Sequence, residues 1–352
     1  MKLYISVLNC VSCVAVVLLH TNGIFWSHPS GELWISANFI ETYFYWAVPI
    51  FFMISGATLM DYRERYTTAE FYKNRIKKTV VPFVFWSLIS GMFMAYISEI
   101  PMDWNIIHII DNTFNTRYFS IYWFFIPLFA IYISFPIISF AAENIQLMTF
   151  FALIGSIVVF TLPLLCELFH ITMNKDVVPP VVSGYMVYIF LGYILDKVTL
   201  DKKKRWSIYI VGIIGWFIHF EGTSMLSTGA EINTMFKGYT NFPCLLQSVA
   251  IFVLFKYMDY KKIFGRFYHI VSDMIFKCAK CTFGVYLLHY FFVIGLPKEF
   301  NIDGRRLIWR VGGGILIFLI CALFTHFAKK IKSLERFCHD LIIIRNVAKN
   351  LY

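Results

Sequence analysis

The stretch that decides the fold runs from Val48 to Trp86 and reads VPIFFMISGATLMDYRERYTTAEFYKNRIKKTVVPFVFW. Its apolar segment Phe51–Leu59 leads through a short, strongly basic loop into a second apolar segment. The apolar side chains require lipid or a protein interior, whereas the Lys and Arg side chains of the loop require water or anions. This junction predicts a membrane boundary and a place where a phosphorylated molecule binds.

The composition of the whole chain agrees with a membrane protein. Of its 352 residues, 59% are hydrophobic and 15% are charged, whereas soluble domains average about 45–50% and 25%. Apolar runs recur along the full length, so we expect an all-α, polytopic transmembrane bundle in which residues 1–352 form one domain, with a cytoplasmic tail at about 328–352. The ten expected spans are Leu3–His20, Phe39–Leu59, Thr79–Ser98, Ser120–Ala141, Leu147–Leu168, Ser183–Leu195, Trp206–Phe220, Asn241–Phe255, Cys281–Leu296 and Leu307–Phe327.

Lys and Arg residues are distributed unevenly among the predicted loops. Of the 31 in the chain, only these fall on the predicted outer side: Arg117, Lys175, Lys237, Lys298, Arg305, Arg306 and Arg310. Because cytoplasmic loops carry the excess of positive charge, we expect both termini in the cytoplasm and insertion into the plasma (inner) membrane. The net charge of +10 is thus spread over separate inner loops, which argues against nucleic acid as a partner. No sequence motif indicates an oligomeric state.

Two cysteine pairs have a spacing that is typical of metal and redox sites, Cys10-x-x-Cys13 and Cys278-x-x-Cys281. Both lie on apolar helical stretches without a second ligand pair nearby, where Cys behaves as a small hydrophobic residue. We therefore interpret them as packing residues and expect neither a metal nor a disulfide framework. The small residues Ser55-Gly56 and Gly312–Gly314 are interpreted as sites of close helix packing as well.

Polar and ionisable side chains within predicted spans are costly, so each is a candidate functional residue: Asn9, His20, Glu41, Glu167, His219, His289, Arg310 and His326. His20 is the strongest, because it ends the first apolar run, where a neutral imidazole can take a proton from a hydroxyl. The alternative is an interfacial His bonded to a loop carbonyl. Asn9 lies eleven residues earlier on the same helical face, about 16 Å along the axis. One helix would thus present polar groups at both ends of a narrow channel.

The basic loop contains a predicted helix start. Thr67-x-x-Glu70 is a capping box, and Pro82 is expected to end the short helix that follows. Arg75 and Lys78 would be neighbours on one face of this helix. Such a pair can bind a diphosphate or a 3′-phosphate, with Arg as a planar fork and Lys as a point charge. The alternative is that these charges mark only the cytoplasmic side.

Aromatic residues recur in the predicted outer loops: Trp26, Trp34, Trp104, Tyr118 and Tyr239. Aromatic side chains are enriched at membrane interfaces, so anchoring is the plainer interpretation. Contact with a sugar ring is the alternative.

Five sequence segments together resemble the acyltransferase 3 family of polytopic membrane acyltransferases, in particular polysaccharide O-acetyltransferases. They are LLH at the end of the first span, VPIFFMISGATL in the second, FYKNRIKKTVVPF in the inner loop and third span, YWFFIPLFAIYISFPII in the fourth and GVYLLH in the ninth. The resemblance covers nearly the whole chain, and the order of the segments agrees with the ten-span layout.

This resemblance implies transfer of an acyl group, usually acetyl from acetyl-CoA, to sugar hydroxyls of surface polysaccharides or related glycans, with no metal. His20 matches the essential His of the family. Arg75 and Lys78 fall on an Arg-x-x-Arg pattern linked to donor binding, with Lys77 beside it. Asn9, expected near the donor, stands where many members carry Arg, and Tyr45 stands at a position that is often basic.

From these residues we expect acyl-CoA to bind from the cytoplasm and its thioester to reach His20. His20 would deprotonate the acceptor hydroxyl or carry the acyl group itself, and both routes remain open. The residues expected to contact substrate or stabilise the oxyanion are Ser55, Tyr122, His289 and Glu41. The alternative functions are a transporter or exporter of a glycan or lipid-linked precursor, and a membrane partner without chemistry.

Overall fold

A computed structural model describes residues 2–174, 176–177, 179, 181–182, 184–228 and 231–330. This part of the chain is helical and contains no β-strand beyond one isolated bridge between Thr228 and Glu231, which confirms the all-α prediction. Its α-helices are α1 (Leu3–Thr21), α2 (Gly31–Phe44), α3 (Ala47–Leu59), α4 (Thr68–Arg75), α5 (Val81–Ser98), α6 (Ile106–Phe114), α7 (Phe125–Ile138), α8 (Ile145–Gly155), α9 (Leu162–Leu168), α10 (Met186–Lys197), α11 (Lys202–Leu226), α12 (Phe242–Tyr257), α13 (Tyr260–Phe264), α14 (Tyr268–Ala279), α15 (Thr282–Phe300) and α16 (Gly314–Ala328).

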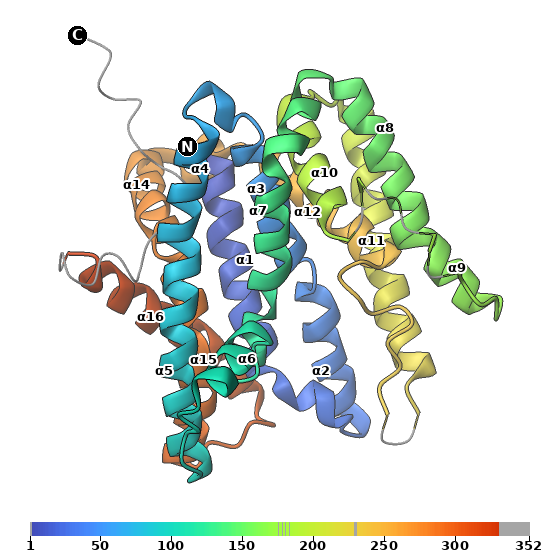
Figure 1. The fold of residues 1–352 in the computed structure, drawn as a ribbon. Helices are drawn as coiled ribbons and strands as arrows, with labels where there is room; N and C mark the ends of the chain where they lie inside the picture. Colours follow the sequence, from blue (N-terminus) through green and yellow to red (C-terminus); the bar gives the residue numbers. More distant parts are fainter. Residues whose placement is uncertain are drawn as a thin grey trace.

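The helices form a bundle around α1 and α3. Figure 1 shows α8, α9 and α11 on one side of this pair and α5 and α16 on the other. The N-terminus, α4 and α14 lie at one end of the bundle, which we call the basic end. The opposite end, where α1 finishes, is called the His20 end. Of the 19 residues of α1, 13 are buried, so this apolar helix is enclosed by protein.

Seven continuous helical segments of the described chain are long and apolar enough to cross a membrane: Leu3–Ser27, Gly31–Glu64, Thr68–Ser98, Ser120–Glu143, Ile145–Leu168, Lys202–Leu226 and Ile308–Ala328. An eighth arises if Phe242–Tyr257 and Tyr260–Ala279, bent by 68°, form one span. The predicted sixth and ninth spans fall on α10 and α15, which do not meet this requirement. α10 is only 12 residues long and ten of them are buried, so it packs within protein. The count of ten spans and the orientation stay predictions, and most of the predicted tail, residues 331–352, lies outside the described chain.

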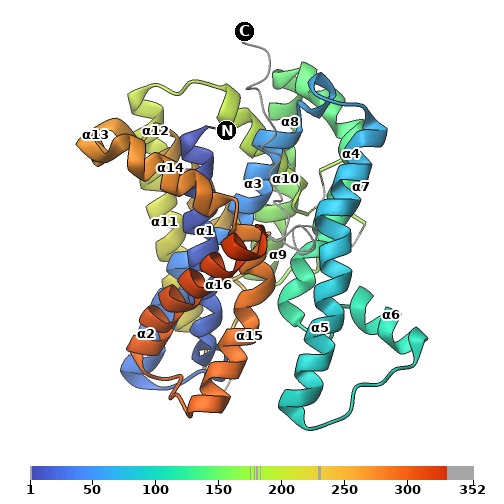
Figure 2. The ribbon, with the colours of Figure 1, turned by 90° about the vertical axis from the view of Figure 1, so that its left-hand side faces the viewer.

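The capping box at Thr67 is confirmed. Thr67 Oγ1 accepts a hydrogen bond from the backbone N–H of Glu70, and the Glu70 carboxylate accepts one from the N–H of Thr67, at 3.3 and 2.9 Å. The expectation that Pro82 ends this helix was wrong. α4 continues through a π-helical turn at Ile76–Val80 into α5, as the long column in Figure 2 shows. Pro82 lies in the first turn of α5, where the wider π turn accommodates a ring without an N–H.

Two glycines bring α3 and α10 into backbone contact. A Cβ atom on Gly56 would lie 2.0 Å from the carbonyl oxygen of Ile189, and one on Gly192 would lie 2.0 Å from that of Met53. Only a residue without a side chain permits this approach, so the interpretation of Gly56 as a packing residue is confirmed. Gly313 and Gly314 are likewise closely packed, and a Cβ on Gly314 would lie 2.8 Å from the hydroxyl of Thr21.

Gly192→Ala should lower the thermal unfolding midpoint of the protein in detergent, because the new methyl group meets backbone that cannot move aside. Overpacking of this kind costs about 1–3 kcal/mol or more. Gly304→Ala is the matched control, since open space surrounds Gly304. Equal midpoints for the two variants would show that the α3–α10 contact is not as close as described.

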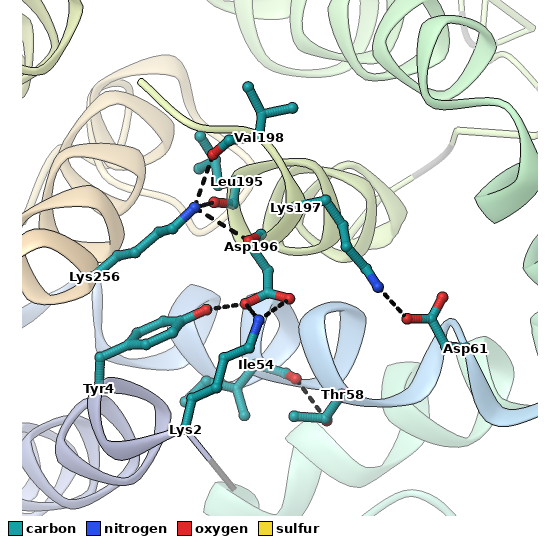
Figure 3. A network of polar contacts seen from close by, with 10 residues as sticks. All are labelled: Lys2, Tyr4, Ile54, Thr58, Asp61, Leu195, Asp196, Lys197, Val198 and Lys256. Carbon is teal, nitrogen blue, oxygen red and sulfur yellow. Dashed lines mark hydrogen bonds and ion pairs between the residues drawn. The ribbon is translucent and has the colours of Figure 1, made fainter. Parts of the chain in front are cut away.

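A buried carboxylate joins the start of α1 to the end of α10 at the basic end (Figure 3). Asp196 accepts hydrogen bonds from Lys2 Nζ at 2.6 and 2.8 Å and another from the hydroxyl of Tyr4. The side chain of Asp196 is only 4% exposed, whereas that of Lys2 is 58% exposed. The buried charge is therefore compensated by a partner that reaches in from the surface.

The last turn of α10 is held by two further lysines (Figure 3). Lys256 of α12 donates to three backbone carbonyl groups, those of Leu195, Asp196 and Val198, at 2.6, 3.1 and 2.8 Å. Lys197 pairs with Asp61, just beyond α3, at 2.6 Å. Carbonyl groups at a helix C-terminus lack intrahelical partners, so the Lys256 ammonium satisfies and stabilises them.

Asp196→Ala should destabilise the protein by about 1–3 kcal/mol, because it leaves Tyr4 and Lys2 without their acceptor. Asp273→Ala is the control, since its pair with Lys277 is exposed on both sides and exposed pairs contribute little. Thermal unfolding of the two variants measures the difference. A loss no larger for Asp196→Ala than for Asp273→Ala would contradict the assigned role of the network.

Candidate functional site

A cavity of about 200 Å³ runs along α1 from its middle to the His20 end. Its lining is mainly aromatic and aliphatic, with a few polar groups, as is usual for ligand sites. The lining residues are Asn9, Val16, Leu19, His20, Trp26, Glu41, Tyr45, Val48, Phe51, Ile121, Trp123, Phe124, Tyr239, Thr282, Phe283 and Tyr286. The sequence had placed Asn9 and His20 at the two ends of one channel, and the structure shows both along this cavity.

His20 lies in the last turn of α1, facing α15. Its ring centroid is 5.2 Å from that of His289 and 5.5 Å from that of Tyr290. The ring therefore has aromatic contacts on one side and the cavity on the other. This arrangement leaves the imidazole able to meet a substrate while its neighbours restrict its orientation.

His289 is fully buried on α15. Its Nδ1 lies 3.0 and 2.8 Å from the carbonyl oxygens of Val285 and Tyr286, and because carbonyls only accept, Nδ1 carries the proton. Nε2 is then an acceptor in the neutral ring, and it has no hydrogen-bond partner among the described residues. The His289 ring, with this unpartnered nitrogen, lies next to the His20 ring.

Arg310 anchors the end of α1 behind His20. It is buried in the π-helical turn Ile308–Gly313, and its guanidinium donates to Ser36 Oγ at 2.9 Å and to Asn22 Oδ1 at 3.3 Å. The hydroxyl of Thr21 donates to the backbone carbonyl of Arg310 at 2.8 Å. Three elements thus meet at the residues directly after His20, which holds the imidazole in place relative to the cavity.

Glu41 of α2 forms a buried ion pair at the His20 end of the cavity. Its Oε1 lies 2.8 Å from Lys237 Nζ, and both side chains are at most 5% exposed. The ammonium lies over three rings, those of Tyr45, Trp26 and Phe25, at 3.7, 4.6 and 5.2 Å from their centroids. Burial lowers the pKa of Lys237, whereas the Glu41 carboxylate opposes that shift.

The break between α2 and α3 directs Tyr45 into the cavity. Pro49 has no N–H to bond the carbonyl of Tyr45, and the carbonyls at the end of α2 accept hydrogen bonds from another helix. Gln247 of α12 donates to those of Thr42 and Tyr43, both at 3.2 Å. The Lys237 ammonium lies over the Tyr45 ring, 3.7 Å from its centroid.

A second, smaller space of about 20 Å³ lies next to the main cavity, on the side of the basic end. Asn9, Phe51 and Phe124 line both spaces, and the rings of Phe51 and Phe124 meet at 6.2 Å between centroids. Asn9 itself donates to the carbonyl of Ala279 at 3.1 Å. Ser55 lines only the smaller space and donates to the carbonyl of Phe51 at 2.9 Å, so it does not approach His20.

Tyr122 is not among the residues that line either space. It is almost fully buried, and its hydroxyl donates to the carbonyl of Leu287 at 2.7 Å. Tyr122 therefore supports the position of α15, which carries His289, and the prediction that it contacts substrate finds no support in this geometry.

The inner-loop cations are not arranged as one exposed pair. Arg75 is 2% exposed and its guanidinium lies 5.6 and 5.4 Å from the ring centroids of Phe71 and Tyr132. Lys78 is half-buried and Lys77 is exposed, because the π turn after Arg75 alters the helical spacing. The smaller space approaches this region, since Leu128, which lines it, and Tyr132 are one turn apart on α7.

Residues 2–326 match the family described as acyltransferase domain. The chain belongs to the acyltransferase 3 family. No curated protein and no solved structure matches it. The family match and the apolar helices together make this chain a membrane acyltransferase, integral to the bilayer.

Several residues of this acyltransferase site were missed from the sequence. Lys237 had been counted only as an outer loop charge, and Trp123 only as part of an apolar span. The sequence pattern that could have indicated Lys237 was weak: a single cation next to the aromatic residues Phe236 and Tyr239, at the uncharged end of a loop. Its partner Glu41 lies 196 positions away, so only the tertiary structure pairs them.

The two cysteine pairs are closer than the sequence indicated. Packing of α1 against α14 brings Cys10 to Cys278, while Cys13 Sγ lies 3.5 Å from the carbonyl of Thr282. The cysteines of the described residues are free, and within that part of the chain no group of three or more His, Cys, Asp and Glu could hold a metal ion. These thiols act as small packing residues with weak backbone hydrogen bonds.

Proposed function

We propose that this acyltransferase moves an acetyl group from cytoplasmic acetyl-CoA to a sugar hydroxyl of a cell-surface polysaccharide or glycan precursor. The observation that carries the proposal is the position of His20. This residue lines a cavity that reaches Asn9, and a second, smaller space lies beyond Asn9 on the side of the basic end. We further propose that the basic end faces the cytoplasm of a plasma (inner) membrane, as the distribution of Lys and Arg predicts.

The sizes of the two spaces support a site in which the reacting groups and the rest of the donor bind at different places. About 200 Å³ is less than the roughly 300–1,000 Å³ of a complete ligand pocket, so this cavity holds the reacting ends of the substrates rather than whole molecules. About 20 Å³ holds one water molecule. In the proposed path, the pantetheine arm passes between Phe51 and Phe124, whose side chains must turn aside to admit it.

The donor phosphates would bind at the basic end. Lys77 is exposed and Lys78 is half-buried next to α5, and Arg75 adds positive potential from its buried position. The capping box holds the start of α4, which keeps these cations near the approach to the smaller space. A CoA diphosphate or 3′-phosphate at the lysines would leave the thioester arm free to enter the bundle.

The transfer chemistry requires one proton acceptor at the His20 end. In direct transfer, a His20 ring nitrogen takes the proton of the acceptor hydroxyl as its oxygen attacks the thioester carbonyl. The C–S bond then breaks, and the CoA thiolate receives the proton from His20. Alternatively, His20 attacks first, forms an acyl-imidazole with release of CoA, and passes the acyl group to the hydroxyl.

His20→Ala should reduce acetyl transfer by about 10²–10⁴-fold, because it removes the proton acceptor. The measurement is transfer of labelled acetyl from acetyl-CoA to surface glycans by the purified protein in nanodiscs. His269→Ala is the matched control, since His269 is exposed on α14. Full transfer by a correctly folded His20→Ala protein would remove His20 from the mechanism.

The double variant Lys77→Gln and Lys78→Gln should weaken CoA binding by about tenfold or more at low salt, and the difference should shrink as salt rises. Binding of CoA to the protein in nanodiscs is the measurement. Lys73→Gln, an exposed lysine on α4, is the control. Unchanged affinity in the double variant would move the phosphate site elsewhere, and no CoA binding by the native protein would favour a transporter instead.

A further inference from the structure

Glu41 has one carboxylate oxygen that its ion pair leaves unused. Oε1 accepts the hydrogen bond from Lys237, whereas Oε2 is buried without a hydrogen-bond partner among the described residues. The residue as a whole is 4% exposed and lines the cavity that contains His20. A buried acceptor that is desolvated and unpaired is costly, so this oxygen is suited to a ligand that donates a hydrogen bond.

We propose that Glu41 Oε2 binds a second hydroxyl of the acceptor, next to the hydroxyl that reacts at His20, and that it restricts the acceptor to uncharged sugars. This inference rests on the proposed function and names the part of the cavity that receives the acceptor. It assigns to Glu41 a positioning and selecting role, while the acyl transfer itself occurs at His20.

Lys237 keeps Glu41 in its binding position. The lysine is enclosed by the rings of Tyr45, Trp26 and Phe25, so its ammonium cannot follow a ligand into the cavity. The ion pair has no net charge, and the side of the carboxylate that remains available is negative. A hydroxyl donor is attracted to that oxygen, whereas a carboxylate or phosphate on the acceptor is repelled and would have to be desolvated.

The walls next to Glu41 are aromatic. Tyr45 stacks on Tyr239 with ring centroids 4.2 Å apart, and Tyr239 stacks on Trp123 at 5.4 Å. All three line the cavity, and the connected stack makes this wall rigid. Trp26 also lines the cavity and is 58% exposed, so it lies where the cavity meets the surface. Flat apolar walls with one hydrogen-bond acceptor fit the C–H faces and hydroxyl groups of a hexose.

The test compares two families of acceptors that differ at C6, one uncharged and one negatively charged. Methyl hexosides and the corresponding methyl uronides, in which the C6 hydroxymethyl group is a carboxylate, are offered with labelled acetyl-CoA to the native protein in nanodiscs. We expect transfer to one or more hexosides and little or none to the uronides. Transfer confined to uronides, or to no member of the panel, overturns the inference.

Glu41→Gln should raise the KM for the preferred hexoside by about tenfold or more, because the sugar hydroxyl then no longer donates its hydrogen bond to a charged carboxylate oxygen. CoA binding, which the proposed function assigns to the basic end, should stay at the native level. Glu32→Gln, an exposed residue on the same helix, is the control. The double variant Glu41→Gln with Lys237→Met removes both charges and should show the same KM defect without an unpaired lysine.

Unchanged KM values in both Glu41 variants would overturn the inference while leaving the proposed function intact, because donor turnover and transfer would persist. If the native protein showed no acetyl-CoA hydrolysis, no CoA binding and no transfer, the proposed function would be overturned, and with it this assignment of Glu41.

Discussion

A polar side chain within a membrane must be enclosed by protein, and the burial of α1 meets this requirement for the whole site. Because α1 is surrounded by other helices, Asn9 and His20 face a protein cavity instead of lipid. The enclosure depends on close approaches elsewhere, such as the backbone contact that Gly56 permits between α3 and α10. It also depends on Arg310, which holds the end of α1 at the point where His20 projects.

The two ends of the site use charge in different ways. At the basic end, Lys77 is exposed and Lys78 is half-buried beside a π-helical turn, where their positive charge can attract an anion. At the opposite end, Glu41 and Lys237 are buried together, and their charges compensate each other inside an aromatic enclosure. Burial of an uncompensated charge would be prohibitive there, which explains why the carboxylate and the ammonium at this end of the cavity are paired.

Much of the fold could be predicted from the sequence, because its signals are local. Apolar runs predicted the helices, the Thr67 capping box was read from two residues three positions apart, and Gly56 indicated close packing. Two local predictions failed for a physical reason. The π-helical turn before Pro82 allowed the helix to continue through this proline. The same turn changed the helical spacing that was expected to place Arg75 and Lys78 side by side.

By itself, the sequence determined that the protein is a helical membrane acyltransferase of a recognisable family, with His20 at the end of its first helix. Apolar runs, charged loops and short motifs each involve residues that are close together in the chain, so they can be recognised without knowing how the helices pack. Only the tertiary structure decided that Glu41 meets Lys237 and that His289 faces His20, because these contacts join residues 196 and 269 positions apart. Packing of whole helices sets such contacts, and no local pattern encodes which side chains then meet.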